Sequence, residues 1–261
     1  LAHDIYTIIL GQARILISQT WSLTTGADGA RSVTIGAGAA NSLDPRSAAF
    51  RNMGIRDLRI MFPDDPIELR YQHDAQARVT GVLDVETVSA GFDAFIFTAF
   101  KTLTVEVYRI ISGQARVDRS NSWTLTLGVD GTRSVSVGVG AVDQLDPRSQ
   151  AFANLDVVAL KAMFSVDPAF VQYVYDPVKA ILTNATAGES ATVGHDAFLF
   201  NVFFTITREI YAVLLGQARV DISNSWTVTD GIDTSKTVTV GEGAIGVLQP
   251  ASQTFANLTV T

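Results

Sequence analysis

Apolar and polar residues alternate with period two along much of the chain, which is the pattern of half-buried β-strands. In the run 123–127 (Trp-Thr-Leu-Thr-Leu), the apolar side chains fall on one face of a strand and the threonines on the other. The run 134–137 (Ser-Val-Ser-Val) continues the alternation, and Asp130-Gly131 between the two runs is a hairpin turn signal. This pattern predicts a β-hairpin, and Asp28-Gly29 predicts a second one in an earlier copy of the same segment.

Further runs of strand length indicate an all-β fold. They cover 55–62, 67–72, 78–83 and 92–108, and the last is long enough for two strands or one bent strand. No stretch keeps a helical period over a helical length, although 155–163 could form a single helical turn. About seven strands in roughly 100 residues is typical of an immunoglobulin-like or jelly-roll-like β-sandwich.

The same pattern recurs in tandem. Gly11-Gln12-Ala13-Arg14 returns at 113–116 and at 216–219, which gives periods of 102 and 103 residues. Residues 11–66 and 113–168 share 30 of 56 identities, and residues 113–154 and 216–257 share 26 of 42. A period of this length is the size of a small domain and exceeds the roughly 20–50 residues of a solenoid repeat. The sequence therefore predicts tandem β-sandwich repeats of about 102 residues.

The repeats divide the chain into four segments. Residues 1–10 match the last strand of a unit, 11–112 and 113–215 are complete repeats, and 216–261 form the first half of a third repeat. The two ends are therefore out of phase with the repeats. Two explanations stay open: longer sequence lies on both sides, or the two open ends complete one another.

Composition removes several classes of function. The net charge is −7, with only four lysines among 261 residues, so the chain lacks the basic footprint of a nucleic-acid-binding protein. The absence of cysteine excludes disulfides and thiolate metal sites. No apolar run reaches the roughly 18 residues that a bilayer-spanning helix needs. We expect neither a nucleic-acid partner nor a membrane span.

Residues with catalytic or ligand-binding chemistry are sparse. The histidines His3, His73 and His195 form no closely spaced pair, and neither a nucleophile elbow nor a phosphate-binding loop is present. The aspartates near turns supply one carboxylate each, which is too few for calcium, so we expect them to form turns. Pro45 and Pro147 in the Leu-Asp-Pro-Arg-Ser segments also predict turns or edges. No catalytic, cofactor-binding or metal-ligating residue is predicted.

The Gly-Gln-Ala-Arg motif is the most distinctive polar element, because it lies between the last strand of one unit and the first strand of the next. The arginines could bind an anion, but we favour a joint between domains in which glutamine and arginine hydrogen-bond across the boundary. The predicted joint consists of Gly11, Gln12, Arg14, Gly113, Gln114, Arg116, Gly216, Gln217 and Arg219.

Large aromatic residues also recur at fixed offsets. Each tryptophan alternates in phase with an apolar residue two positions on, which favours a core position over an exposed platform for sugars. The predicted core residues are Trp21, Trp123, Trp226, Phe50, Phe152 and Phe255.

Several of these segments together resemble a known class of proteins. The paired strands at 226–231 and 235–240, the segment 153–164, the strand at 170–175 and the Asp-Ala-Phe-Leu-Phe at 196–200 are similar to the small β-sandwich structural proteins of tailed bacteriophage virions, here in tandem. The resemblance implies a virion component without enzymatic activity. The tandem fusion, the Gly-Gln-Ala-Arg motif and the Asp-Pro-Arg-Ser turn depart from that pattern.

The leading expectation is therefore a non-enzymatic structural repeat protein of an extracellular assembly, such as a virion decoration, fibre or tail-associated component. Its partners would be itself or other virion or surface subunits, with a host-surface glycan as a further possibility, and it would reside in a virion or at the cell exterior. Two alternatives stay open: a stalk fragment of a bacterial adhesin or surface-layer protein, and a carbohydrate-binding module.

Overall fold

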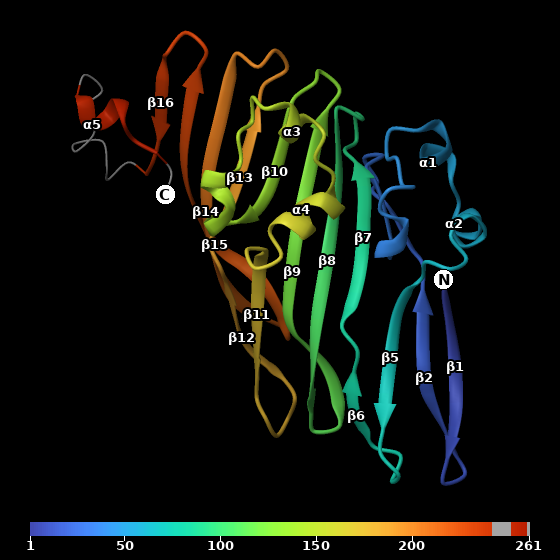
Figure 1. Ribbon diagram of the computed structural model, residues 1–261. Helices are drawn as coiled ribbons and strands as arrows, with labels where there is room; N and C mark the ends of the chain where they lie inside the picture. The colour runs from blue at the N-terminus through green and yellow to red at the C-terminus, as the bar shows by residue number, and fades with distance from the viewer. Residues whose placement is uncertain (242–251, 260–261) are drawn as a thin grey trace.

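The computed structural model describes residues 1–241 and 252–259 of the chain (Figure 1). The prediction of an all-β protein is confirmed, since strands make up 54% of the structure and helices 14%. The strands form large antiparallel sheets, consistent with a β-sandwich class of fold. Short helices supply the layer that packs on one face of the long strands (Figure 1).

The elements recur in the same order along the chain. The first set of strands is β1 (Ala2–Ile9), β2 (Gln12–Thr20), β3 (Ser22–Thr25), β4 (Arg31–Gly36), β5 (Ile67–His73), β6 (Val79–Val82) and β7 (Val85–Phe92). The second set is β8 (Thr98–Ile111), β9 (Gln114–Gly128), β10 (Arg133–Gly138), β11 (Ala169–Tyr175), β12 (Leu182–Ala187) and β13 (Ser190–His195). The last is β14 (Asn201–Leu214), β15 (Gln217–Gly231) and β16 (Lys236–Thr239).

The helices lie at matching places between the strands. The first copy contains η1 (Ala37–Ala39), α1 (Ala48–Asn52) and α2 (Ile55–Met61). The second contains η2 (Val139–Gln144), α3 (Gln150–Ala153) and α4 (Val157–Met163), and α5 (Gln253–Ala256) follows β16. The strand predicted at 55–62 is therefore wrong, and the single turn predicted at 155–163 is the longer helix α4.

Helical spacing of the apolar residues explains these two differences. Leu58 and Phe62 in the first copy, and Val157, Leu160 and Phe164 in the second, are all buried. They recur at intervals of three or four residues, the spacing of one helix face. Asp156 also caps α4, because its carboxylate accepts a hydrogen bond from the Ala159 N–H at 2.8 Å.

Three long hairpins form the frame of the sheet: β1–β2, β8–β9 and β14–β15. Each turn has two residues with positive φ, such as Ser112 at 49° and Gly113 at 75°, the geometry of a type I′ turn that matches strand twist. Each hairpin also shifts register at an equivalent point, just before Tyr6, Tyr108 or Tyr211. The predicted boundaries at 10/11, 112/113 and 215/216 thus fall at hairpin tips.

Between two hairpins, the chain forms a meander whose middle strands are interrupted. Both β10 and β11 pair antiparallel with β9, the first beside its upper part and the second beside its lower part. The chain leaves the sheet after Gly138, runs through η2, α3 and α4, and returns at Asp167, whose carbonyl accepts the Gly138 N–H at 2.7 Å. A Cβ atom on Gly138 would lie 2.8 Å from the Asp167 carbonyl oxygen, which explains the glycine.

The upper parts of the strands form one continuous sheet that runs through all copies. The strand order is β3-β4-β7-β8-β9-β10-β13-β14-β15-β16, and every neighbouring pair is antiparallel. Along the lower parts, β5–β6 and β11–β12 fill the spaces between the hairpins (Figure 1). Consecutive repeats are therefore joined by main-chain hydrogen bonds.

The helices cover the apolar face of this sheet. One continuous core cluster contains the inward-facing residues of β4, β7, β9, β10 and β13 together with the buried residues of both helical segments. The Asp-Pro-Arg-Ser turns begin the short helices, because Ser47 and Ser149 accept hydrogen bonds from the N–H groups of Phe50 and Phe152, each at 3.1 Å. These two caps place the phenylalanine rings in the core.

We expect Phe152→Ala to lower the free energy of unfolding by about 3–5 kcal/mol, because Phe152 is 2% exposed and its removal leaves a cavity. Phe198→Ala is the matched control, since Phe198 is 75% exposed at a turn. Urea unfolding followed by circular dichroism measures both. Equal midpoints for the two variants would contradict the assignment of Phe152 to the core.

Candidate functional site: the contacts between repeats

The Gly-Gln-Ala-Arg motifs lie at the tips of the three long hairpins and not between packed domains. The Arg14, Arg116 and Arg219 side chains donate to the glutamine two residues earlier in the same strand, at 2.6, 2.6 and 2.7 Å. A Cβ atom on Gly11, Gly113 or Gly216 would contact nothing within 4 Å. The predicted joint is therefore wrong, because residues two apart on a strand share a face and bond locally.

A side-chain contact between repeats is made instead by the Asp-Pro-Arg-Ser turn. The Arg46 guanidinium donates to the carbonyl of Gly128 at 2.6 Å, at the end of β9 in the next repeat. The Arg148 guanidinium makes the equivalent bond to the carbonyl of Asp230 at 3.0 Å. Both bonds join residues 82 positions apart. The same offset in both copies identifies these arginines as the repeating side-chain link.

A lysine lies between the two copies beside this link. The Lys101 ammonium donates to the Ala40 carbonyl at 3.0 Å. Burial lowers the pKa of Lys101, and the carboxylates of Asp44 in the first repeat and Asp156 in the second oppose that shift. A cavity of about 160 Å³ adjoins the lysine. The ammonium group of Lys101 therefore interacts with carboxylates from both copies.

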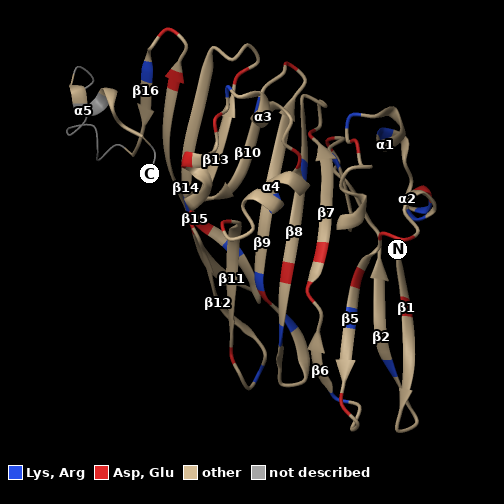
Figure 2. Ribbon diagram, viewed as in Figure 1, with Lys and Arg blue, Asp and Glu red and all other residues tan. Residues whose placement is uncertain are grey.

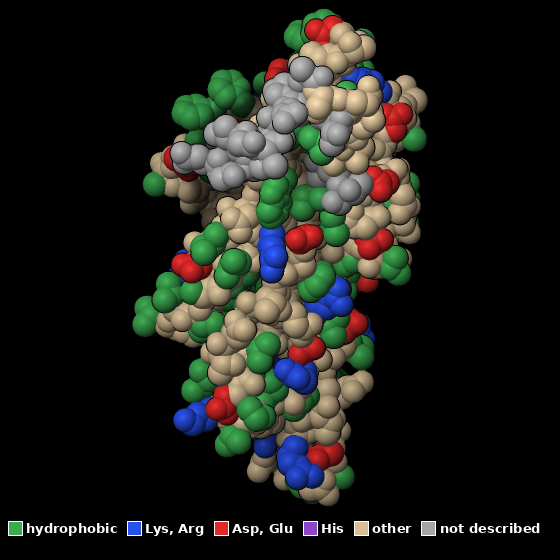
Figure 3. Space-filling model, turned by 90° about the vertical axis from the view of Figure 1, so that its left-hand side faces the viewer, with side chains coloured by type: hydrophobic (Ala, Val, Ile, Leu, Met, Phe, Trp, Pro, Cys, Tyr) green, Lys and Arg blue, Asp and Glu red, His purple; other side chains and the backbone are tan. Residues whose placement is uncertain are grey.

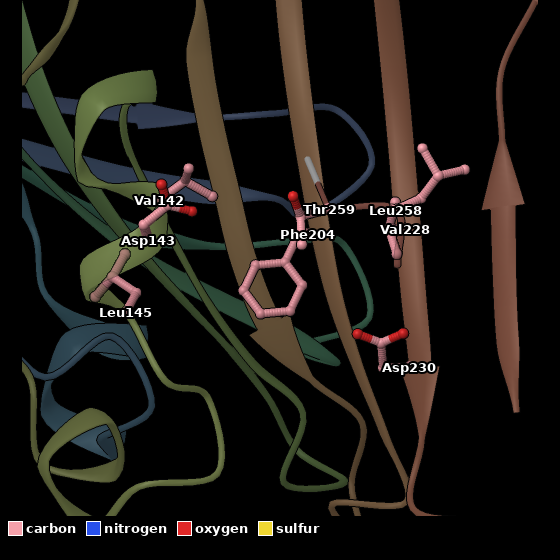
Figure 4. A pocket seen from close by; sticks show the side chains of 8 residues that line it. All are labelled: Val142, Asp143, Leu145, Phe204, Val228, Asp230, Leu258 and Thr259. Atoms are coloured by element: carbon pink, nitrogen blue, oxygen red, sulfur yellow. The ribbon is translucent and has the colours of Figure 1, made fainter. Parts of the chain in front are cut away.

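A second cavity occupies the equivalent position between the second and third copies. Its volume is about 230 Å³, below the roughly 300 Å³ at which ligand pockets begin. Figure 4 shows η2 on one side of it and β14 and β15 on the other. The residues that line it are Val142, Asp143, Leu145, Phe204, Val228, Asp230, Leu258 and Thr259. We interpret both cavities as gaps at the joints between copies and not as ligand pockets.

Ion pairs add to these joints. The Lys161 ammonium on α4 lies 2.6 Å from the Glu86 carboxylate on β7, so it connects the second repeat to the first. Lys236 lies 2.9 Å from Asp230, the residue whose carbonyl accepts from Arg148. Ion pairs near the protein surface contribute about 1 kcal/mol or less each. The main-chain pairing of the strands therefore dominates the joint.

Two of the three tryptophans lie in the core beneath the helices. Trp21 and Trp123 are 2% and 3% exposed, and their indole N–H groups donate to the carbonyls of Phe62 at 2.9 Å and Phe164 at 3.0 Å. Phe50 and Phe152 are buried in the same cluster. The prediction is wrong for Trp226, which is 40% exposed. The side chain of Phe255 lies outside the described residues.

The other polar residues singled out in the sequence do not converge on a site. His195 is buried beside Phe152 and contacts the Asp196 carbonyl, whereas His3 contacts Gln19. Asp130 accepts a hydrogen bond from the Thr132 N–H at 2.9 Å, which lowers the pKa of its carboxyl and stabilises the turn. Among the described residues, no group of three or more His, Asp or Glu side chains is placed to hold a metal ion.

A pair of tyrosines marks the hairpins below the register shift. The phenols of Tyr108 and Tyr211 donate to the carboxylates of Glu106 and Glu209, both at 2.6 Å. Burial raises the pKa of both phenols, and the neighbouring carboxylates raise it further. The Glu-x-Tyr spacing that brings these groups together is visible in the sequence, since residues two apart on a strand share a face, but the burial of the phenols is seen only in the structure.

No family model matches the chain, and no curated protein matches it significantly. None of the helices that the structure describes is long and apolar enough to cross a membrane.

We expect Arg46→Ala to lower the free energy of unfolding by about 1.5–3 kcal/mol, because it removes a charged donor from the partly buried Gly128 carbonyl. Arg116→Ala is the matched control, since its bond to Gln114 is exposed at a hairpin tip; we expect a change within about 0.5 kcal/mol. Urea unfolding of the whole chain measures both. Equal losses, or a larger loss for Arg116→Ala, would refute this assignment of the link.

Alkaline titration tests the Tyr108 environment. A phenol pKa raised above its unfolded value stabilises the fold below pH about 10, and this contribution is lost as the pH rises through the folded pKa. Tyrosinate absorbance should therefore include a fraction that appears only when the protein unfolds in strong alkali. Tyr108→Phe should reduce that late fraction. A reduction of the ordinary fraction near pH 10 instead would contradict the buried Glu106–Tyr108 bond.

Proposed function

We propose that the protein is a non-enzymatic structural repeat protein of an extracellular assembly, with a tailed-phage virion as the leading setting. It would serve there as a decoration, fibre or tail-associated component. The observation that carries the proposal is the continuous antiparallel sheet, which passes through successive repeats without a linker. Such a sheet holds each repeat in a fixed register with its neighbour.

The construction suits a spacer that must keep its shape. The strands β8 and β9 pair along their whole lengths, from Thr98↔Gly128 to Ile111↔Gln114, and β14 and β15 repeat this pairing. Arg46 and Arg148 then fix the helical side of each joint. Swivelling one repeat against the next would break main-chain bonds on one side and these links on the other. A rigid spacer is therefore the task that this geometry favours.

Sheet edges offer a route to assembly with further subunits. Within the described residues, β1 pairs only with β2, and β16 pairs only with β15. Exposed edges pair readily with strands of another chain. Figure 3 shows that the side facing the viewer carries hydrophobic and polar side chains, with charges of both signs dispersed among them. A second copy of this chain, or another subunit with a free edge, is the partner that we propose.

A bacterial adhesin stalk or surface-layer protein remains the alternative, because tandem rigid units serve that role equally well. The carbohydrate-binding alternative has less support. Trp21 and Trp123 are buried in the core, so the three tryptophans do not form a common exposed platform for a host-surface glycan.

Immunogold labelling of the native source tests the setting. An antibody raised against the purified chain should place gold on capsids, tails or fibres in negative-stain micrographs. Gold on the cell envelope would instead favour the adhesin alternative, and soluble label away from any assembly would overturn the structural role.

Edge pairing predicts self-association that rises with concentration. Sedimentation velocity should show larger species at higher protein concentration, and the double substitution Ile5→Lys and Ile8→Lys on β1 should reduce them, because edge lysines block strand addition. Ile60→Lys on α2 is the control, since it places a lysine at an exposed isoleucine away from β1. A wild-type chain that stays monomeric at all concentrations would exclude pairing between copies.

A further inference from the structure

The face of the sheet that points away from the helices carries an unbroken row of hydroxyl side chains. At one level of the upper sheet, a serine or threonine of each strand lies opposite a serine or threonine of the next strand. One residue from each strand contributes. This hydroxyl row is Ser22, Thr34, Ser89, Thr102, Thr124, Ser136, Thr192, Thr205, Thr227 and Thr239.

The hydroxyl row is held in place by its own hydrogen bonds. Successive members bond in separate pairs: Thr34 with Ser89 at 2.8 Å, Thr102 with Thr124 at 2.9 Å, Ser136 with Thr192 at 2.7 Å, and Thr205 with Thr227 at 2.9 Å. A hydroxyl can donate once and accept twice, so each paired member keeps capacity for a second partner. The bonds restrict the rotamers and preorganise the row for an external partner.

The positions two residues above the hydroxyl row extend it into an array. They are Thr24, Ser32, Gly91, Phe100, Thr126, Ser134, Gly194, Phe203, Thr229 and Thr237. The two phenylalanines do not stand out from the surface. A Cβ atom on Gly91 would lie 2.8 Å from the Phe100 ring, and one on Gly194 would lie 2.6 Å from the Phe203 ring. Each ring therefore lies over the facing glycine.

Both rows are free of charge along all of these described strands, in a chain of net charge −7. The nearby cations Arg31, Lys101 and Arg133 are each one residue away from a member of these rows, so they lie on the opposite, helical face. Figure 2 shows the charged residues gathered near turns, strand ends and the lower parts of the strands. Charge attraction therefore does not recruit a partner to this face.

Tandem duplication does not account for the hydroxyl row. Duplication relates β4 to β10 and β7 to β13, but it does not relate β4 to β7 or β8, which are different strands of one repeat. These strands nevertheless place Thr34, Ser89 and Thr102 in line. The alignment arises from the pairing registers of unlike strands, and it spans the joints between repeats.

The spacing of the array restricts its partner. Strands lie about 4.8 Å apart, and alternate residues of a strand lie about 6.7 Å apart. A single hydroxyl bond to a partner gains only about 0.5–1.5 kcal/mol over a bond to water. Many such bonds add up only when the partner repeats at the same distances, so the array selects a crystalline surface over an irregular one.

We propose that this hydroxyl array binds the surface of crystalline water. Oxygen atoms in hexagonal ice repeat at distances close to both spacings of the array, and water both donates and accepts, as the hydroxyls do. The threonine methyl groups fill the spaces between the hydroxyls and bury small apolar areas on contact. This inference does not rest on the proposed structural role.

Two other occupants fit less well. Proteins bind crystalline polysaccharides largely by stacking aromatic rings on the sugars, and Phe100 and Phe203 are the only aromatic residues in the two rows of the array. A second protein copy would gain little, because exchanging hydroxyl–water bonds for hydroxyl–hydroxyl bonds is nearly neutral without apolar burial. Both occupants remain outcomes of the test.

The experiment is ice-affinity partition of the whole purified chain, combined with thermal hysteresis measured on a single ice crystal. The wild-type chain should enter the growing ice fraction and lower the freezing point below the melting point. The double variant Thr124→Lys and Thr205→Lys should lose both effects, because it places bulky charges in the middle of the row. Thr80→Lys, on β6 outside the array, is the matched control and should keep both.

A milder variant separates a loss of ice binding from a loss of folding. Thr124→Val with Thr205→Val keeps side-chain shape and β-propensity but removes two hydroxyls, and we expect it to weaken hysteresis while its circular dichroism stays unchanged. Exclusion of the wild-type chain from ice would overturn the proposal. Equal hysteresis for wild type and the lysine double variant would overturn it too. Binding to chitin or cellulose powder without ice partition, or dimerisation that the lysine variant abolishes, would assign the face to those partners instead.

Discussion

Antiparallel pairing of long strands, with apolar side chains on one face and hydroxyls on the other, is the constraint on which the rest of the structure depends. Because side chains alternate strictly, a slip of one residue would move the apolar set to the open face. Trp123 and Leu125 on β9 therefore fix the register against Leu103 on β8. The type I′ turn at Ser112-Gly113 fixes the same register from the other end of the hairpin. Core burial and turn geometry agree, and this agreement holds each hairpin in one arrangement.

The helical layer follows from an interruption of that sheet. Strands β10 and β11 continue one another beside β9, and the chain leaves between them because Gly138 allows the Asp167 carbonyl to approach closely. The segment between β10 and β11 packs Phe152 and Leu160 into the core. The apolar face of the sheet is therefore covered by residues inserted between two strands that continue one another. The open face receives no such insertion within the described meander. The insertion of the helical segment on one side only thus gives the two faces of the sheet different chemistry.

Much of this architecture could be predicted from the sequence, and the failures have physical causes. The alternation at 123–127 and the Asp130-Gly131 turn identified the β9–β10 hairpin, and the identities between copies identified the repeats. The helix α2 was missed because its short apolar pattern also suits a strand. The Gly-Gln-Ala-Arg motif was assigned to a joint because a turn between two strands looks like a linker until their pairing is known. Arg46 was missed because its partner lies 82 residues away.

The two joints show why side chains alone are a poor guide to such a protein. In the first joint Lys101 is half-buried between carboxylates from both copies, whereas in the second the same register position holds Phe204. The third Asp-Pro-Arg-Ser counterpart has Ala251 in place of the arginine, outside the described residues. Chemistry on the helical side of the joints therefore varies between copies. On the sheet side, β8 pairs with β9 and β14 with β15 in equivalent registers. Main-chain hydrogen bonds do not depend on side-chain identity, so they keep the sheet continuous through both joints.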